Sequence, residues 1–173
     1  MKKIIIFGNS GSGKSTLAKK LCSDNNLAHL DLDLIAWVTT SLGMPQRMSL
    51  SDSKRKIDNF IDKNNHKGWV IEGCYADLLA IVDANEAIYM DLPIGLCVEN
   101  AKNRPWEAHK YETKKAQDDN LDMLINWIQD YDKRRDTFSK LAHTELFEQF
   151  NGDKVRCLTN LEEGFIERQF EKE

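Results

Sequence analysis

The stretch that decides the fold is IIIFGNSGSGKST, residues 4–16. Its first four residues, Ile4 to Phe7, form an uninterrupted apolar run, which is typical of a strand buried on both faces of a parallel sheet. Residues 8–15 then match the pattern G-x-x-x-x-G-K-[S/T] at every fixed position, and a helix is predicted to begin near Lys14. A strand, a glycine-rich loop and a helix in this order predict a loop that binds the phosphate groups of a nucleotide.

The composition of such a loop follows from its chemistry. Glycines allow backbone conformations that are closed to other residues, so that successive N–H groups point toward phosphate oxygens. The N-terminal end of the helix adds its positive partial charge. Lys14 is expected to reach the β- and γ-phosphates, and Ser15 is expected to offer its hydroxyl to Mg²⁺. We therefore predict that ATP binds with Mg²⁺ at Gly8, Asn9, Ser10, Gly11, Ser12, Gly13, Lys14, Ser15 and Thr16.

The rest of the chain alternates between strand and helix patterns. Further strands are predicted at residues 27–30, 69–71, 87–90 and 155–158, and helices at residues 14–24, 51–64, 95–103, 118–142 and 161–170. This alternation predicts one α/β domain over residues 1–173, with a parallel sheet covered by helices on both faces. Two stretches without a clear period, residues 34–50 and 104–115, are candidates for mobile segments.

Acidic residues follow three of the predicted strands. Ligands of open α/β sheets bind at the carboxyl ends of the strands, so these residues are candidates for a phosphoryl-transfer site. We predict that Glu72 lies on the Mg²⁺ side, and that Asp33, with Asp31 beside it, faces the acceptor or the metal. Asp91 precedes Leu92-Pro93 and is predicted to act as a turn or cap residue instead.

Basic residues in and after the irregular stretches are candidates for neutralising the transferred phosphoryl group. Arg104 begins the second stretch, and Arg134 and Arg135 lie on the long predicted helix that follows. Arg47 lies in the first stretch, where an acceptor would bind. Three lysines lie within or just beyond the second stretch: Lys110, Lys114 and Lys115. We predict catalytic contacts from the first three arginines and an acceptor contact from Arg47.

The composition predicts a globular cytoplasmic protein. The 173 residues carry a net charge of −4 without a basic stripe, so a nucleic-acid partner is not expected. The apolar run at the N-terminus is too short for a signal peptide, and no stretch is long enough to predict a membrane span. The cysteines form no Cys-x-x-Cys pair and are predicted to be free thiols: Cys22, Cys74, Cys97 and Cys157. The histidines show no metal-ligand spacing, and nothing in the sequence indicates the oligomeric state.

Beyond the loop, the sequence resembles the adenylate-kinase-related P-loop kinases, and most of all the bacterial proteins known as topology modulation proteins. The resemblance is carried by residues 8–15, Asp31-Leu32-Asp33, the run WVIEGCY at residues 69–75, and Asn126-Trp127. It implies a P-loop NTPase fold whose five-stranded parallel sheet has the order 2-3-1-4-5. It also implies an acceptor-binding segment over about residues 34–65, Gly73 at the acceptor site, and a lid over about residues 104–117.

The departures from these kinases concern the acceptor. Adenylate kinases carry an arginine that grips the acceptor nucleotide where this chain has Ala76, which argues against AMP as the acceptor. They carry another arginine where this chain has Asn100. Shikimate kinases are a weaker resemblance: they share the two aspartates at 31 and 33, and their lid arginine is similar to Arg104-Pro105. Their triple-glycine turn, however, is not reproduced by Glu72-Gly73-Cys74.

Two functions remain open at the level of the sequence. The first is a phosphotransferase that moves the γ-phosphoryl group of ATP to an unidentified small acceptor, either a nucleotide or a hydroxyl metabolite. The second, suggested by Ala76, is a regulatory module that binds or hydrolyses ATP without a metabolite acceptor. Acceptor-stimulated formation of ADP distinguishes the two.

Overall fold

The computed structural model describes residues 1–39, 45–108 and 110–160. The predicted helix over residues 161–170 lies outside the described residues, as do residues 40–44 of the first irregular stretch. Among the described helices, none is both long enough and apolar enough to cross a membrane.

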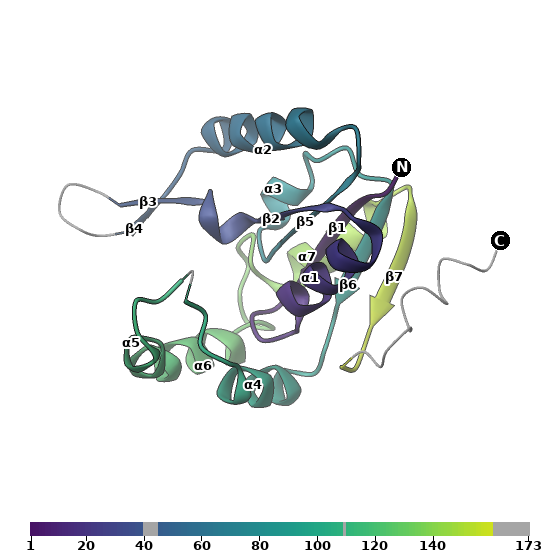
Figure 1. Cartoon of the computed structure of the whole chain (residues 1–173). Helices are drawn as coiled ribbons and strands as arrows, with labels where there is room; N and C mark the ends of the chain where they lie inside the picture. Colours follow the sequence, from purple (N-terminus) through teal and green to yellow (C-terminus); the bar gives the residue numbers. More distant parts are fainter. Residues whose placement is uncertain (40–44, 109, 161–173) are drawn as a thin grey trace.

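A parallel sheet of five strands forms the centre of the molecule (Figure 1). Its strands are β1 (Lys3–Gly8), β2 (Ala28–Asp31), β5 (Trp69–Gly73), β6 (Glu86–Met90) and β7 (Asp153–Cys157), in the order β2-β5-β1-β6-β7. β1 is central, because Ile5 pairs with Ile71 on one side and with Ala87 on the other. Both faces of β1 are buried, which explains why its sequence is continuously apolar instead of alternating.

The strand numbers differ from the expected order 2-3-1-4-5 because the prediction leaves out two short strands. β3 (Trp37–Thr39) and β4 (Pro45–Arg47) pair with each other in a separate antiparallel hairpin. When this hairpin is left aside, the strands of the large sheet are the second, third, first, fourth and fifth along the chain. The hairpin escapes prediction because its residues are mostly exposed and therefore carry no apolar pattern.

Helices cover both faces of the sheet, which confirms the predicted α/β class. The helices are α1 (Lys14–Asn25), the short 3₁₀ turn η1 (Leu32–Leu34), α2 (Leu50–Asn64), α3 (Ala76–Leu79), α4 (Ile94–Asn103), α5 (Lys114–Asp119), α6 (Leu121–Gln129) and α7 (Lys140–Gln149). Apolar side chains of α1, α4 and α6 pack with Ile4 and Ile6 on one face. Those of α2, α3 and α7 pack with Ile5 and Phe7 on the other face.

The single long helix predicted over residues 118–142 is wrong. α6 ends at Gln129, the chain turns through residues 130–139, and α7 starts at Lys140. Two hydroxyl groups stabilise this break: Ser139 Oγ accepts from the N–H of Ala142 and caps α7, and Thr137 Oγ1 donates to Asp77 at 2.8 Å. The cap at Ser139 is local and the contact of Thr137 with Asp77 joins residues 60 positions apart, and an apolar period reveals neither of them.

The four cysteines are free thiols, as predicted. Burial raises the pKa of Cys22, Cys97 and Cys157 to about 11, so these thiols are protonated at neutral pH. Their contribution is therefore to packing and not to nucleophilic chemistry.

Candidate functional site

The loop between β1 and α1 turns through backbone conformations that favour glycine. Gly8, Gly11 and Gly13 have φ values of +146°, +75° and +87°. A Cβ atom on Gly11 would lie 2.2 Å from the carbonyl oxygen of Cys97, and one on Gly8 would lie 2.3 Å from that of Met90. Glycine is therefore required at these two positions both by the backbone conformation and by the close approach of neighbouring chain.

The first turn of α1 presents hydrogen-bond donors to this loop. Lys14 is buried, and its Nζ donates to the carbonyl oxygen of Asn9 at 2.8 Å. No side chain caps the N-terminus of α1, and the buried Ser12 hydroxyl has no hydrogen-bond partner within the described part of the chain. Open donors at the positive end of a helix fit the oxygens of a phosphate group.

Two asparagine side chains, one in the loop and one in α4, connect the loop to neighbouring helices. Asn9 Nδ2 donates to the carbonyl oxygen of Ile128 in α6 at 3.1 Å, and Asn100 Nδ2 in α4 donates to that of Gly11 at 2.9 Å. The loop is thus fastened to the two helices that flank the segment predicted as a lid. Asn100, where adenylate kinases would have an arginine, here positions the loop backbone.

The ends of β2 and β5 bring three acidic side chains together. Asp31 lies opposite Glu72 in the strand register, and Asp31 Oδ1 accepts from the N–H of Asp33 at 2.9 Å. Lys110 completes the cluster, because its Nζ lies 2.7 Å from Asp33 Oδ2 and 3.1 Å from Asp31 Oδ2. The segment predicted as a lid therefore contacts the strand ends through an ion pair.

The two aspartates have pKa values shifted in opposite directions. Burial and the charges of Glu72 and Asp33 raise the pKa of Asp31. Burial also acts to raise the pKa of Asp33, but the Lys110 ammonium and the Tyr75 hydroxyl, which donates to Asp33 Oδ1 at 2.5 Å, outweigh it and lower that pKa. Burial by itself lowers the pKa of the Lys110 ammonium, but the charges of the two aspartates outweigh it and raise that pKa. Asp33 is consequently ionised at neutral pH, beside a charged lysine.

Aromatic and charged residues fasten the β3–β4 hairpin beside this cluster. Trp37 Nε1 donates to the Tyr75 hydroxyl at 2.8 Å. The Arg47 guanidinium donates to both carboxylate oxygens of Asp77 at 3.2 Å and lies over the Tyr75 ring, 4.7 Å from its centre. Arg47 therefore lies near the predicted acceptor side, but its charge is paired within the protein.

Glu72 and Ser15 fit a magnesium ion that is bound mainly through phosphate oxygens and water. Glu72 is 1% exposed, and its Oε1 has no hydrogen-bond partner among the described residues and lies 3.4 Å from His29 Nε2. In the described ranges, no three His, Cys, Asp or Glu side chains are grouped so that they hold a metal by themselves. Mg²⁺ needs only one or two protein ligands when phosphate is present, and both residues line the same cavity.

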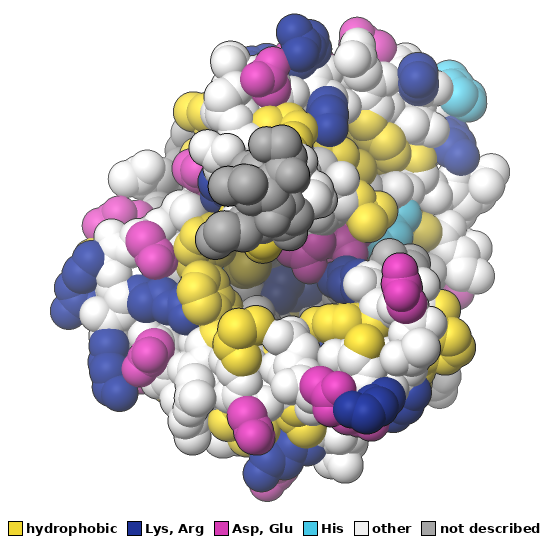
Figure 2. Space-filling model, turned by 90° about the vertical axis from the view of Figure 1, so that its left-hand side faces the viewer, with side chains coloured by type: hydrophobic (Ala, Val, Ile, Leu, Met, Phe, Trp, Pro, Cys, Tyr) yellow, Lys and Arg dark blue, Asp and Glu magenta, His cyan; other side chains and the backbone are white. Residues whose placement is uncertain are grey.

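One cavity of about 600 Å³ unites these groups. Figure 2 shows a hollow in this face of the molecule, with basic and acidic side chains in its depth. The lining comes from the glycine loop with α1, from the strand ends, and from the segment after α4. It includes residues 10–17, Asp33, Glu72, Gly73, Cys74, Asn100, Arg104, Glu107, Lys110 and Tyr111. Its size suits a small-molecule ligand.

Not all residues of the predicted site reach this cavity. Arg134 and Arg135 lie in the turn after α6, because the helix on which they were placed is absent. Arg134 stacks on the Trp127 ring, 3.0 Å from its centre, and Arg135 Nη1 donates to carbonyl oxygens of its own turn. Neither arginine, nor Arg47, is among the described residues that line the cavity. Their contacts with a ligand stay predictions.

Two residues beside Asp33 were missing from the predicted site. Lys110 lies 77 positions away along the chain, in a stretch where the sequence shows several lysines without indicating which one meets an aspartate. Tyr75 belongs to the run WVIEGCY, but only the structure shows its hydroxyl on Asp33. The sequence drew attention to both residues, but it did not indicate that either one contacts Asp33.

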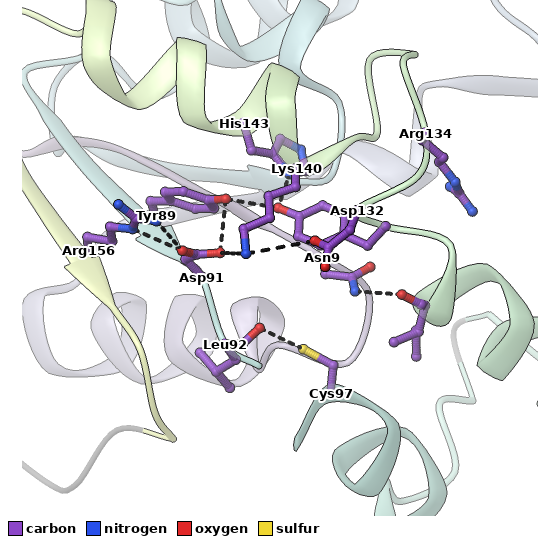
Figure 3. A network of polar contacts seen from close by, with 12 residues as sticks. Asn9, Tyr89, Asp91, Leu92, Cys97, Asp132, Arg134, Lys140, His143 and Arg156 are labelled. Atoms are coloured by element: carbon purple, nitrogen blue, oxygen red, sulfur yellow. Dashed lines mark hydrogen bonds and ion pairs between the residues drawn. The ribbon is translucent and has the colours of Figure 1, made fainter. Parts of the chain in front are cut away.

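A second polar network surrounds Asp91 at the end of β6 (Figure 3). Asp91 is buried at the end of β6, where it pairs with Arg156 and with Lys140 and accepts from the Tyr89 hydroxyl at 3.1 Å. Tyr89 in turn contacts the Tyr131 hydroxyl at 3.1 Å. Asp91 was predicted to be a turn or cap residue and not a ligand. It does not cap α4, because Pro93 holds the N-cap position without a side-chain hydrogen bond. Its carboxylate instead pairs with two cations from later elements, and it is not among the described residues that line the cavity.

Comparison with known proteins establishes the fold. No family model matches the chain, and no curated protein matches it. Among solved structures, the chain is similar to a sugar kinase from Janibacter sp. HTCC2649, with a TM-score of 0.53 and 14% identity over 99% of this chain and 91% of that one. It is also similar to a gluconokinase from Sinorhizobium meliloti 1021, with a TM-score of 0.52 and 12% identity over 97% and 88% of the two chains. The chain therefore has an α/β fold that also occurs in these kinases.

Proposed function

We propose that the chain is a cytoplasmic P-loop kinase, related to the adenylate kinases and topology modulation proteins, that moves the γ-phosphoryl group of ATP to a small acceptor. The observation that carries this proposal is that Lys14 and Asp33 line one cavity, Lys14 at the glycine loop and Asp33 at the strand ends. The similarity in fold to two kinases supports the class of reaction, whereas the acceptor has to be argued from the site itself.

At the nucleotide end, the glycine loop would bind the phosphates. Lys14 exchanges its hydrogen bond with the Asn9 carbonyl for the β- and γ-phosphate oxygens, and backbone N–H groups of the loop donate to the same oxygens. Ser15 and Glu72 would hold Mg²⁺, which supplies charge neutralisation on the phosphates. Arg104, paired with Glu107 at 2.8 Å, adds a cation to the wall of the cavity.

At the acceptor end, Asp33 receives a hydrogen bond from the acceptor hydroxyl. The acceptor oxygen forms a bond to the γ-phosphorus, the bond from that phosphorus to the oxygen bridging to the β-phosphate breaks, and ADP leaves. The hydroxyl proton passes to Asp33 Oδ. Because the pKa of Asp33 is lowered, it is a weak base; we expect it mainly to orient the hydroxyl and to take the proton late in the reaction.

Substitution of Lys14 tests this proposal. In an assay of ADP release from Mg-ATP with a panel of hydroxyl compounds, Lys14→Ala should lower the acceptor-dependent rate by about a hundredfold or more, because it removes a cation from the transferred phosphates. Lys19→Ala, an exposed lysine on the same helix, is the matched control and should keep the full rate.

Retention of the full acceptor-dependent rate by Lys14→Ala would overturn the proposal. Slow ATP hydrolysis that depends on Lys14 but is the same with every acceptor would favour the regulatory ATP-hydrolysing module instead.

A further inference from the structure

We propose that the phosphoryl acceptor is an uncharged polyhydroxyl compound, and not a phosphorylated or carboxylated one. This inference rests on the proposed kinase function and concerns the acceptor end of the same cavity. It follows from the balance of charge among the described residues at that end and from the partners that each cation already has.

Acidic groups outnumber basic ones at the strand ends. Asp33 and Glu72 line the cavity, and Asp31 lies behind them against Lys110. Lys110 brings one positive charge to this group, and its ammonium already pairs with both aspartates. An anionic acceptor would meet like charges in a partly buried site, where repulsion is weakly screened.

The arginines near this end are already paired. Arg47 donates to both oxygens of Asp77 and stacks on Tyr75, and Arg104 pairs with Glu107. A guanidinium group suits the phosphate of a nucleotide acceptor, because its two parallel N–H donors match two phosphate oxygens. No described arginine that lines or borders the cavity lacks a carboxylate partner.

The remaining capacity for hydrogen bonds suits hydroxyl groups. The Asp33 oxygens have lone pairs beyond those used by Tyr75 and Lys110. The Lys110 ammonium uses two of its three donors on the aspartates, which leaves one for a hydroxyl oxygen. Several acceptors and one donor, side by side, are complementary to a compound rich in hydroxyl groups.

Matched pairs of acceptors test the inference. Acceptor-dependent ADP release would be compared for hexitols and the corresponding aldonic acids, for aldoses and their phosphates, and for nucleosides and their 5′-monophosphates. The uncharged member of the productive pair should have a kcat/KM higher by about tenfold or more. Lys110→Gln removes the positive charge at this end and should widen this ratio about tenfold, whereas Lys19→Gln, at an exposed lysine, should leave the ratio unchanged.

Binding of a fluorescent ATP analogue separates the two proposals. If the analogue binds the wild type but not Lys14→Ala, and only anionic acceptors raise ADP release, this inference is overturned while the kinase function stands. If the analogue does not bind, or if no acceptor of either kind raises the rate, both proposals are overturned.

Discussion

Gly11 shows how a single residue sets the shape of the glycine loop between β1 and α1. Its φ of +75° lies in the left-handed region, and a Cβ atom would lie 2.2 Å from the carbonyl oxygen of Cys97. We predict that Gly11→Ala lowers the free energy of unfolding by about 1–3 kcal/mol, because the backbone strain cannot be relieved without moving α4. It should also weaken ATP binding. Chemical denaturation and nucleotide titration measure the two effects.

Gly95 provides the matched control for this substitution. It lies in the first turn of α4, and a Cβ atom there would meet nothing within 4 Å. Gly95→Ala should therefore leave ATP binding unchanged and raise the free energy of unfolding by about 0.5–1 kcal/mol, since alanine loses less backbone entropy in a helix. Equal effects of the two substitutions would contradict the account of the loop.

His143 is a buried residue whose protonation is linked to stability. Its Nδ1 lies 2.8 Å from the Tyr131 hydroxyl and its Nε2 lies 3.0 Å from the Cys74 carbonyl oxygen, so a neutral ring with its proton on Nε2 satisfies both contacts. Burial lowers the pKa of this imidazole from 6.5 to about 4. Between these values the unfolded chain binds a proton that the folded chain does not.

The stability contributed by neutral His143 is consequently complete above pH 6.5 and is lost as the pH falls from 6.5 toward 4. We predict a slope of at most about 1 kcal/mol per pH unit in this window, measured by urea unfolding at several pH values. His143→Gln should remove that part of the slope, whereas His66→Gln, at an exposed histidine, should keep it. Parallel pH profiles for the wild type and His143→Gln would argue against the linkage.

At the scale of elements, the break between α6 and α7 depends on the hydroxyl of Ser139, which caps α7. Ser139 is 1% exposed, and its Oγ accepts from the N–H of Ala142. Ser139→Ala should lower the free energy of unfolding by about 1 kcal/mol, because the first turn of α7 loses its cap. Ser23→Ala, at an exposed position within α1, should leave it unchanged or raise it by a few tenths of a kcal/mol, because alanine is the better helix former. Thermal unfolding of both variants makes the comparison, and equal losses would speak against a cap at Ser139.

The elements also show which parts of the fold can be predicted from the sequence. Three strands of the large sheet, β1, β5 and β6, are buried on both faces or nearly so, and each leaves a short apolar run that stands out from its neighbours. The β3–β4 hairpin leaves no such run because its residues are mostly exposed, and α3, with four residues, is too short to show a helical period. The start of α7 was not predicted, because the charged residues before it are compatible with a helix and a single serine does not by itself mark a helix start.

The candidate site also has a part that the sequence predicts and a part that it does not. Its glycine loop is local in the sequence, so the motif located Lys14 and Ser15 directly. The pairing of Lys110 with Asp33 joins residues 77 positions apart, and the pairing of Asp91 with Arg156 joins residues 65 apart. Periodicity and motifs carry no information about such contacts, which depend on how the elements pack.

At the scale of the whole molecule, the fold leaves the carboxyl ends of the strands accessible. The β3–β4 hairpin and the α4–α6 helices lie on opposite sides of these ends (Figure 1), and the cavity opens in the face between them (Figure 2). The glycine loop shares this cavity with Asp33 and Gly73, two of the predicted acceptor residues, so two ligands could meet there without a large rearrangement of the sheet. In the proposed reaction, the γ-phosphoryl group passes within this cavity from ATP to the acceptor.

The most direct test follows the phosphate itself. The protein would be incubated with ATP labelled on the γ-phosphate and with the acceptor that most stimulates ADP release, and the labelled products would be separated. The account predicts that the label appears in the acceptor, and that Asp33→Asn reduces this transfer by about a hundredfold while ATP still binds. Label found solely in inorganic phosphate, at the same rate with or without acceptor, would contradict it.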